Sequence, residues 1–178
     1  LQTYKNFKIY IIDDNSEEDI SKVVKKFENV LNICYVKNEI NFGPAKSRNI
    51  GIKMGNGELI SFLDSEIIDF AMLSLLSDDV WDENKLMSSV NIFYLDKKVG
   101  MTCGNYRVWI NRQRVKSPFY SKNIDVNFET LKRVNFVASG SVTVRRRVLD
   151  DVGLFNENYI IAEDYDLWIR ISKKYKIH

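Results

Sequence analysis

The sequence has little histidine and cysteine, two residues that often catalyse reactions or hold metal ions near neutral pH. Its only histidine, His178, is the last of 178 residues, which excludes most His-based catalytic triads and His-rich metal sites. The cysteines Cys34 and Cys103 lie far apart in strand-like segments, so no Cys-x-x-Cys pair can bind zinc or carry out redox chemistry. Carboxylates must therefore carry any chemistry.

Long apolar runs and a strong excess of one charge are also absent. No stretch approaches ~18 uninterrupted apolar residues, and residues 1–7 lack the architecture of a secretory signal. We therefore expect a cytoplasmic protein with at most peripheral contact with a membrane. Because 26 basic residues nearly balance 24 acidic ones, nucleic acid is not an expected partner.

Two short apolar runs end abruptly in acidic residues. The first runs into Asp13 and Asp14, and the second ends at Asp64. Short runs that are apolar on both faces are typical of buried strands in a parallel sheet, and such sheets bind ligands beyond the carboxyl ends of their strands. The acids therefore indicate a site that holds a metal ion, the hydroxyls of a sugar or base, or both.

Strand-like and helix-like segments alternate along the first part of the chain. This alternation predicts an α/β fold with a mostly parallel sheet flanked by helices, and mixed strands in the C-terminal half. Because no internal repeat or linker is visible, residues 1–178 are expected to form one domain. The predicted strands are 7–12, 32–36, 58–63, 99–110 and 134–144, and the predicted helices are 17–29 (with Ser16 as its N-cap), 43–55, 83–96 and 163–175.

Four segments, in this order, resemble the inverting family 2 glycosyltransferases with a GT-A (Rossmann-like) fold. The resemblance implies transfer of a sugar, with inversion, from a nucleotide diphosphate donor (a UDP-sugar is expected) to a glycan or lipid-linked acceptor. It also implies a role in bacterial cell-envelope polysaccharide synthesis, in the cytoplasm or at the inner face of the membrane. The segments are residues 11–16, 41–65, 139–146, and 152–157 followed by 163–170.

The resemblance assigns the donor side of the site to residues from three segments. The pair Asp13 and Asp14, mainly through Asp14, is implied to contact the base or ribose, since a carboxylate accepts hydrogen bonds from N–H groups and hydroxyls. Arg48 and Asp64 are implied to lie against the donor. The alternatives are a turn in which the acids cap the following helix, and a solvent-facing arginine. The turn and the donor contact can both hold.

The expected metal motif is interrupted in this chain. Relatives place Asp-x-Asp directly after the third strand, where it binds Mg²⁺ or Mn²⁺ together with the pyrophosphate. Here Asp64 is separated from Asp78 and Asp79 by the largely apolar residues 66–77. We interpret that segment as an insertion that splits the motif and leaves these three aspartates as ligands. The alternative is a local Asp-x-Glu motif formed by Asp64 and Glu66, with the later acids capping a helix.

The catalytic base is expected on the helix predicted over 163–175. Helical spacing places Asp164 on the face of Leu167, Trp168 and Ile171, so an acid leads an apolar face. The alternative role for Asp164 is an N-terminal cap. The resemblance makes Asp164 the residue that takes the proton of the acceptor hydroxyl, and gives Glu163 a role in orienting the acceptor or the base.

The acceptor side is expected to include Ser139, Gly140 and Trp168. Ser139 and Gly140 resemble a strand edge near the sugar pocket, where glycine permits close approach of the backbone. Trp168 has the alternative of a purely core position.

The chain departs from the family pattern at its ends. Relatives begin with a further strand and helix and continue beyond a position like His178, so we expect a fragment truncated at the N-terminus and perhaps at the C-terminus. Two other functions stay open: a catalytically impaired nucleotide-binding or scaffolding descendant, and a different α/β nucleotide enzyme such as a nucleotidyltransferase. The latter would be expected to have a basic Gly-rich phosphate loop, and none is visible.

Overall fold

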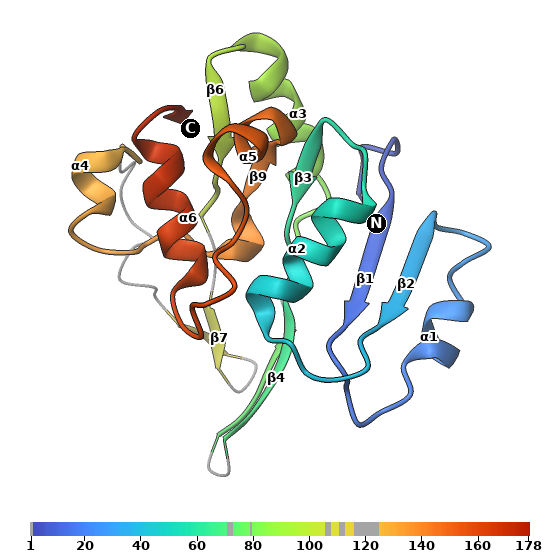
Figure 1. Cartoon of the computed structure of the whole chain (residues 1–178). Coiled ribbons are helices and arrows are strands. Elements are labelled where there is room, and N and C mark those ends of the chain that lie inside the picture. The colour runs from blue at the N-terminus through green and yellow to red at the C-terminus, as the bar shows by residue number, and fades with distance from the viewer. Residues whose placement is uncertain (1, 71–72, 79, 106–107, 111–112, 116–124) are drawn as a thin grey trace.

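The computed structural model describes residues 2–70, 73–78, 80–105, 108–110, 113–115 and 125–178, and only the backbone within 65–79 and 106–124. Strands and helices alternate through much of the chain (Figure 1). In order, the elements are β1 (Ile9–Asp13), α1 (Ser21–Lys25), β2 (Ile33–Lys37), α2 (Pro44–Met54), β3 (Leu59–Ser61), β4 (Ser65–Phe70), β5 (Leu73–Asp78), α3 (Lys85–Leu95), β6 (Val99–Thr102), β7 (Val108–Ile110), β8 (Gln113–Val115), α4 (Phe128–Leu131), the 3-10 turn η1 (Ser139–Ser141), β9 (Thr143–Arg145), α5 (Arg146–Val152), α6 (Glu163–Ser172) and β10 (Lys176–Ile177).

The first strands form the parallel pair that the sequence predicts. β1 and β2 run parallel, with Ile11 opposite Tyr35. α2 then begins at Pro44, whose fixed φ suits the first turn of a helix, after Gly43 at φ 83°, a conformation that glycine adopts readily. The predicted helix over 43–55 is confirmed, and it packs against β1.

β3 does not continue that parallel pair, which corrects the expectation of one parallel layer. It lies in a separate four-stranded sheet with the order β10-β6-β9-β3, where β3 pairs antiparallel with β9 and β6 pairs parallel with β10. The carboxyl ends of β1, β2 and β3 nevertheless point to the same edge of the molecule, the lower edge in Figure 1. The start of α6 lies at this edge too.

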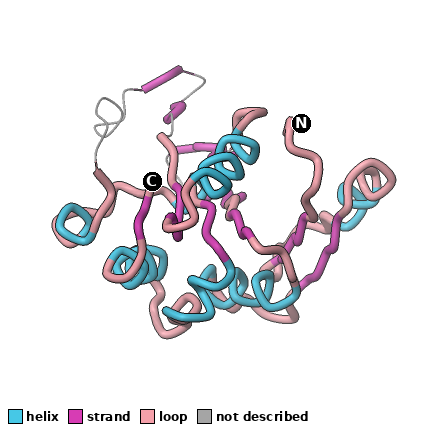
Figure 2. The backbone as a smooth tube through the Cα atoms, turned by 90° about the horizontal axis from the view of Figure 1, so that it is seen from above, coloured by secondary structure: helices cyan, strands magenta, loops and turns pink. Residues whose placement is uncertain are grey.

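Helices cover both sides of the strands, as the view from above shows (Figure 2). Three aromatic rings pack edge to face in the core: Phe62 lies 5.3 Å from Phe155, and Phe155 lies 6.1 Å from Trp168, between ring centroids. No helix among the described residues is long and apolar enough to cross a membrane. Among the described residues, the largest fully buried side chains are Val99, Met101, Leu131, Val142, Val144, Val148, Leu149, Leu167, Trp168, Ile171 and, on α3, Phe93.

The helix predicted over 17–29 is much shorter in the structure. α1 covers only Ser21–Lys25, and Phe27 is exposed rather than packed as the apolar spacing implied. Ser16 is not an N-cap, because its backbone N–H donates to Asp13 in a turn that ends β1. Of the four apolar residues in the pattern only Val24 is buried, where α1 contacts β2, and so little packing does not stabilise a longer helix.

Residues 65–70 and 73–78 pair with each other as the two strands of a hairpin. β4 and β5 are antiparallel, and the register places Ser65 opposite Asp78 and Phe70 opposite Leu73. The two strands extend away from the body of the molecule at its lower edge (Figure 1). The backbone of Asp78 therefore returns to the position that follows Asp64.

Two glycines offer a test of how β6 packs against Tyr175: Gly100 lies within β6, and Gly104 follows it. A Cβ added at Gly100 would lie 2.7 Å from the Cβ of Tyr175, whereas one added at Gly104 would meet no atom within 4 Å. We expect Gly100→Ala to lower the free energy of unfolding by about 1–3 kcal/mol through overpacking, and Gly104→Ala to leave it nearly unchanged. Urea denaturation of both variants measures the difference, and equal stabilities would contradict the packing described.

Candidate functional site

One buried arginine joins the end of β3 to the start of α6. Arg48, on α2, donates from Nε and Nη2 to both carboxylate oxygens of Asp64, at 3.2 and 2.8 Å. Its Nη1 donates to Oε1 of Glu163 at 2.5 Å. The planar guanidinium suits such a two-sided contact, because its donors form a rigid fork. Three segments that the sequence predicted for the site are thereby brought together.

The surroundings of Arg48 keep it charged. Burial lowers the pKa of the guanidinium, but the carboxylates of Asp64 and Glu163 outweigh burial and raise that pKa above its ordinary value. The guanidinium also lies 5.4 Å from the ring centroid of Phe155, which adds a cation–π contact. The alternative of a solvent-facing arginine at position 48 is thus wrong, since the side chain of Arg48 is 13% exposed.

The predicted base, Asp164, lies next to this ion-paired group. Its Oδ2 accepts a hydrogen bond from the hydroxyl of Ser139 at 2.8 Å, and its Oδ1 accepts from the backbone N–H of Tyr165 at 2.6 Å. Ser139 belongs to the turn η1 rather than to a strand edge, which corrects the expectation for Ser139 and Gly140. Asp164 is half-buried, and the helix face behind it is buried as its spacing predicted.

The carboxylate of Asp14 holds the loop that leads into α2. Oδ1 accepts from the side-chain amide of Asn38 at 2.7 Å and from the N–H of Phe42 at 2.9 Å, while Oδ2 accepts from the N–H of Gly43 at 2.7 Å. Burial raises its pKa, but these bonds more than compensate, so the pKa of Asp14 lies below its usual value. The capping alternative for this acid is wrong, because neither α1 nor α2 has a side-chain cap hydrogen bond, and Asp14 instead holds the loop before α2.

Asp13 is almost fully buried and serves the first turn. Its Oδ2 accepts from the hydroxyl of Tyr35 at 2.7 Å, with Nζ of Lys37 3.8 Å away, and its Oδ1 accepts from the N–H of Ser16 at 2.8 Å. Burial raises the pKa of Asp13, and the bonds from Tyr35 and Ser16 outweigh it and lower the pKa overall. The same bond to Asp13 raises the pKa of Tyr35 to about 12. Asp13 thus offers little open surface to a ligand.

Of the predicted metal ligands, only Asp64 has a side chain among the described residues. Asp64 follows β3, and the hairpin register brings the backbone of Asp78 opposite Ser65. Mg²⁺ is commonly held by one or two protein carboxylates together with substrate phosphates, and Asp64 has the oxygen ligands that such a cation prefers. The side chains of Glu66 and Asp78, and all of Asp79, lie outside the described residues. Among the described residues, no three acidic, histidine or cysteine side chains lie close enough together to hold a metal ion.

Two residues that the sequence analysis did not select tie the segment after the hairpin to η1. Nε1 of Trp81 donates to the carbonyl of Gly140 at 2.6 Å. Nζ of Lys85 lies 4.3 Å from the centroid of the Trp81 ring and donates to Thr143 Oγ1 at 2.8 Å. Burial lowers the pKa of Lys85 to about 8. These contacts join the segment that follows Asp78 to residues 139–143, and Ser139 of that segment donates to Asp164.

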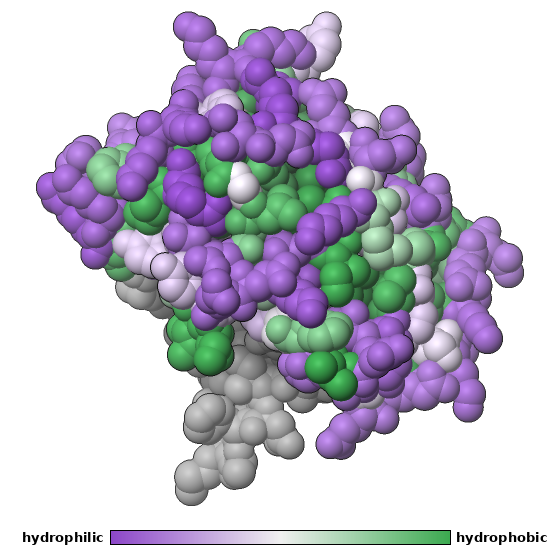
Figure 3. All heavy atoms as spheres, in the orientation of Figure 1, coloured by the Kyte–Doolittle hydropathy of each residue, from purple (hydrophilic) through white to green (hydrophobic). Residues whose placement is uncertain are grey.

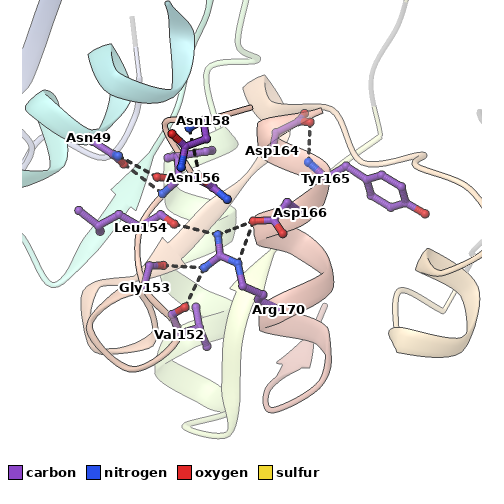
Figure 4. Close-up of polar contacts among 11 residues, drawn as sticks. Asn49, Val152, Gly153, Leu154, Asn156, Asn158, Asp164, Tyr165, Asp166 and Arg170 are labelled. Carbon is purple, nitrogen blue, oxygen red and sulfur yellow. Dashed lines mark hydrogen bonds and ion pairs between the residues drawn. The ribbon is translucent and has the colours of Figure 1, made fainter. Parts of the chain in front are cut away.

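A further pair of residues fixes the loop between α5 and α6 (Figure 4). Arg170 donates to Asp166 and to the carbonyls of Val152, Gly153 and Leu154. Asn49 on α2 binds both backbone groups of Phe155, donating to its carbonyl at 2.9 Å and accepting from its N–H at 3.1 Å. Apart from the i,i+4 pair of Asp166 and Arg170, no local pattern marks these contacts, because the partners come from other segments of the chain.

Trp168 is part of the core, which corrects its assignment to the acceptor side. Its side chain is fully buried and packs against Phe62 and Phe155. Since α6 turns this residue inward together with Leu167 and Ile171, its ring offers no surface to a sugar.

The sequence as a whole places the chain in a known family. The pattern described as glycosyl transferase family 2 matches residues 1–153, so the chain belongs to this family. The resemblance inferred from four separate segments is thereby confirmed.

Curated relatives from Escherichia coli cover nearly the whole chain. WfaP, a UDP-Glc:alpha-D-GlcNAc-diphosphoundecaprenol beta-1,3-glucosyltransferase, is 31% identical over 175 residues, which are 97% of this chain and 61% of WfaP. WfgD, which carries the same enzyme description, is 28% identical over 172 residues, 97% of this chain and 60% of WfgD. The chain thus spans about three fifths of the length of each relative.

Solved structures share the fold. TarS of S. aureus, residues 1–349 in complex with UDP, superposes with a TM-score of 0.74 at 22% identity, covering 99% of this chain and 49% of that one. The mannosyltransferase PcManGT from Pyrobaculum calidifontis, in complex with GDP-Man and Mn²⁺, superposes with a TM-score of 0.71 at 18% identity, covering 99% and 46%. The expected α/β GT-A fold is confirmed.

The buried pair of Asp13 and Tyr35 predicts a pH-dependent loss of stability. A carboxylate with a lowered pKa in the folded state stabilises the fold above its unfolded pKa of about 3.9, and this contribution disappears as the pH falls through the folded value. We expect Tyr35→Phe to cost about 1–3 kcal/mol at pH 7. The difference from wild type should shrink as the pH falls below about 3.9 and should disappear once the pH has passed through the lowered folded-state pKa of Asp13.

Urea denaturation at pH 7 and pH 3 measures this effect. Tyr175→Phe is the matched control, because the Tyr175 hydroxyl binds the exposed carboxylate of Asp151 at 3.0 Å. Tyr175→Phe should lose less stability than Tyr35→Phe does at pH 7, and its loss should be small at pH 3 as well. A deficit of Tyr35→Phe that stays constant with pH would show that Asp13 is not the group involved.

Proposed function

We propose that this chain transfers a sugar, with inversion, from a nucleotide diphosphate donor to a lipid-linked acceptor, with the help of Mg²⁺ or Mn²⁺. UDP-sugar is the proposed donor class, because TarS was solved with UDP and the E. coli relatives use UDP-Glc. The lipid-linked acceptor is proposed from the undecaprenol substrates in the names of the same relatives. The cytoplasmic face of a membrane is the corresponding location.

The observation that carries this proposal is the contact of Arg48 with Asp64 and Glu163. It brings the acid at the end of β3, where the donor phosphates are expected, to the start of the helix that presents the proposed base. The donor and acceptor must meet within about 3–3.5 Å for in-line attack, so both groups of residues need a shared, rigid support. Arg48 supplies it from the middle of α2.

Asp164 is the proposed general base. Its Oδ2, now bonded to Ser139, is the atom that would take the proton of the attacking acceptor hydroxyl. Ser139 orients that carboxylate, and Glu163 stays fixed on Arg48 beside it. Arg48 is also the proposed contact for the departing diphosphate, since a guanidinium binds phosphate oxygens in the geometry in which it binds carboxylates.

Asp64 and Asp78 are the proposed metal ligands, with Asp79 as a further candidate. A divalent cation bound there would neutralise the charge that develops on the departing nucleoside diphosphate. Arg48 occupies both oxygens of Asp64 in this structure, so it competes with the cation for that carboxylate. Asp14 is proposed to support the base-binding loop through Phe42 and Gly43, with its donor contact a secondary role.

Removing the proposed base tests the reaction. We expect Asp164→Asn to lower kcat for transfer from UDP-sugar by about 10²–10⁴-fold, because general base catalysis contributes that much, while the affinity for UDP stays unchanged. Asp166→Asn is the matched control, since Asp166 lies on the same helix and pairs with Arg170 on its other side. Equal rates for Asp164→Asn and wild type would refute the assignment.

Titration of UDP with and without Mn²⁺ tests the proposed metal site. We expect Mn²⁺ to tighten UDP binding by about tenfold, which corresponds to about 1.4 kcal/mol. Asp64→Asn should lose this enhancement, and Glu129→Gln, which removes an exposed acid on α4, should keep it. Binding that does not change between Mn²⁺ and a chelator would favour the impaired nucleotide-binding descendant.

A further inference from the structure

Hydrophobic side chains are exposed on each segment that borders the candidate site. Ile160 and Ile161 are 88% and 82% exposed, and they come directly before the helix that begins with Glu163 and Asp164. Leu63, directly before Asp64, is exposed as well. The remaining exposed hydrophobic residues of these segments are Ile40 and Phe42 before α2, Val80 after β5, and Tyr159 beside Ile160.

The loop that carries the two isoleucines is held at both ends. Arg170 binds the carbonyls of residues 152–154, and Asn49 fixes Phe155, as described above. The N–H of Tyr159 then donates to the carbonyl of Asn156 at 3.1 Å, closing a turn, and α6 begins four residues later. The anchored loop therefore keeps Ile160 and Ile161 exposed. This exposure leaves apolar surface in water, which costs free energy.

These segments lie along one edge of the molecule. The loops before α2 and α6 are both at the lower edge in Figure 1, and the hairpin of β4 and β5 extends from it. Figure 3 shows hydrophobic surface at this edge on both sides of the grey atoms. In sequence, eight of the 12 residues 66–77 are apolar. The edge that presents the acids is thus also an apolar edge.

A lipid surface is the partner that fits this arrangement, and the inference rests on the proposed function. If the acceptor sugar is joined through a diphosphate to a polyprenyl chain, as in the names of WfaP and WfgD, its hydroxyl is held close to the membrane. That hydroxyl can reach Asp164 only when the lower edge faces the membrane. The exposed side chains that border Asp164 would then face the lipid surface, beside the hairpin that extends from the same edge.

We infer that residues 159–161 insert into the surface of the membrane that carries the acceptor. The two isoleucines enter the boundary between headgroups and acyl chains, and Tyr159 stays at the headgroup level, where its hydroxyl is hydrated. The insertion orients the site toward the acceptor, so the segment contributes to use of the lipid-linked substrate and not to the chemical step.

Vesicle binding of the whole 178-residue chain tests this inference. The probes are vesicles of phosphatidylcholine alone and vesicles that also contain phosphatidylglycerol, in a flotation assay. We expect the double variant Ile160→Asp/Ile161→Asp to bind at least about tenfold more weakly, since each buried isoleucine is worth roughly a factor of ten in affinity. Ile160→Leu/Ile161→Leu should bind like wild type.

Leu95→Asp is the matched control. Leu95 is 81% exposed at the end of α3, at the opposite edge in Figure 1, and the substitution adds the same kind of charge. It should leave vesicle binding unchanged. Wild-type binding should also persist at about 0.5 M NaCl, because apolar insertion is not screened by salt. Equal binding by Ile160→Asp/Ile161→Asp and Leu95→Asp, or binding that salt abolishes, would overturn the inference.

If a partner other than lipid covers residues 159–161, the experiments give different results, and these results also overturn the inference. A wild-type dimer that the double aspartate variant converts to a monomer, without vesicle binding, would show that a second copy covers residues 159–161. A monomer that does not bind vesicles would show that lipid is not the partner. Light scattering after size exclusion measures the oligomeric state.

Activity separates this inference from the proposed function. Transfer to a short-chain, water-soluble acceptor should be equal for wild type and the double variant, whereas transfer to the polyprenyl acceptor in vesicles should fall about tenfold or more in the variant. Equal loss on both acceptors would refute insertion but retain the transferase. Isoleucine-dependent vesicle binding without transfer to either acceptor would refute the transferase but retain insertion.

Discussion

The arrangement of the site depends on the pairing of one buried guanidinium with two carboxylates. Taking an arginine and two acids out of water is costly, and the cost is offset only when geometry and hydrogen bonds are nearly complete. Arg48 meets this condition, because three of its nitrogens donate to Asp64 and Glu163. Loss of the arginine would leave Glu163 buried without its partner. The interaction therefore constrains both acids to one place.

Arg48 also connects parts of the fold that share no backbone ladder. It lies on α2, which packs against β1, while Asp64 follows a strand of the separate four-stranded sheet and Glu163 begins α6. Asn49, the next residue of α2, binds the backbone of Phe155. Consecutive residues of one helix thus hold both the donor side and the loop that leads to the proposed base.

The same edge combines acids with exposed hydrophobic side chains, and the proposed function would account for both features. The proposed donor, with its two phosphates, would need cationic or metal-binding groups, and the proposed polyprenyl-linked acceptor would need approach to a lipid surface. The anchored loop before α6 would serve both, because Ile161, which would contact lipid, and Asp164, the proposed base, are only three residues apart. The hairpin extends the edge without displacing Asp78 from Ser65, so the proposed metal motif is compatible with the insertion.

The sequence by itself determined the features that local pattern controls. It determined the start of α2 at Gly43 and Pro44, because φ preferences act within a residue. It also determined the buried face of α6 behind Asp164, because helical spacing alone sets which residues share a face. The acids at the ends of β1 and β3 were likewise visible as abrupt changes in hydropathy. Four weak motifs in order were sufficient to indicate the family.

Only the tertiary structure decided which groups meet. The pairing of Arg48 with Glu163 joins residues 115 positions apart, and the bond of Asp14 to Gly43 and that of Ser139 to Asp164 also cross long stretches of chain. The shortness of α1, the separation of β3 from β1 and the burial of Trp168 followed from the same cause. Such contacts depend on how whole elements pack, and periodicity along the chain carries no information about which surface a helix or strand finds.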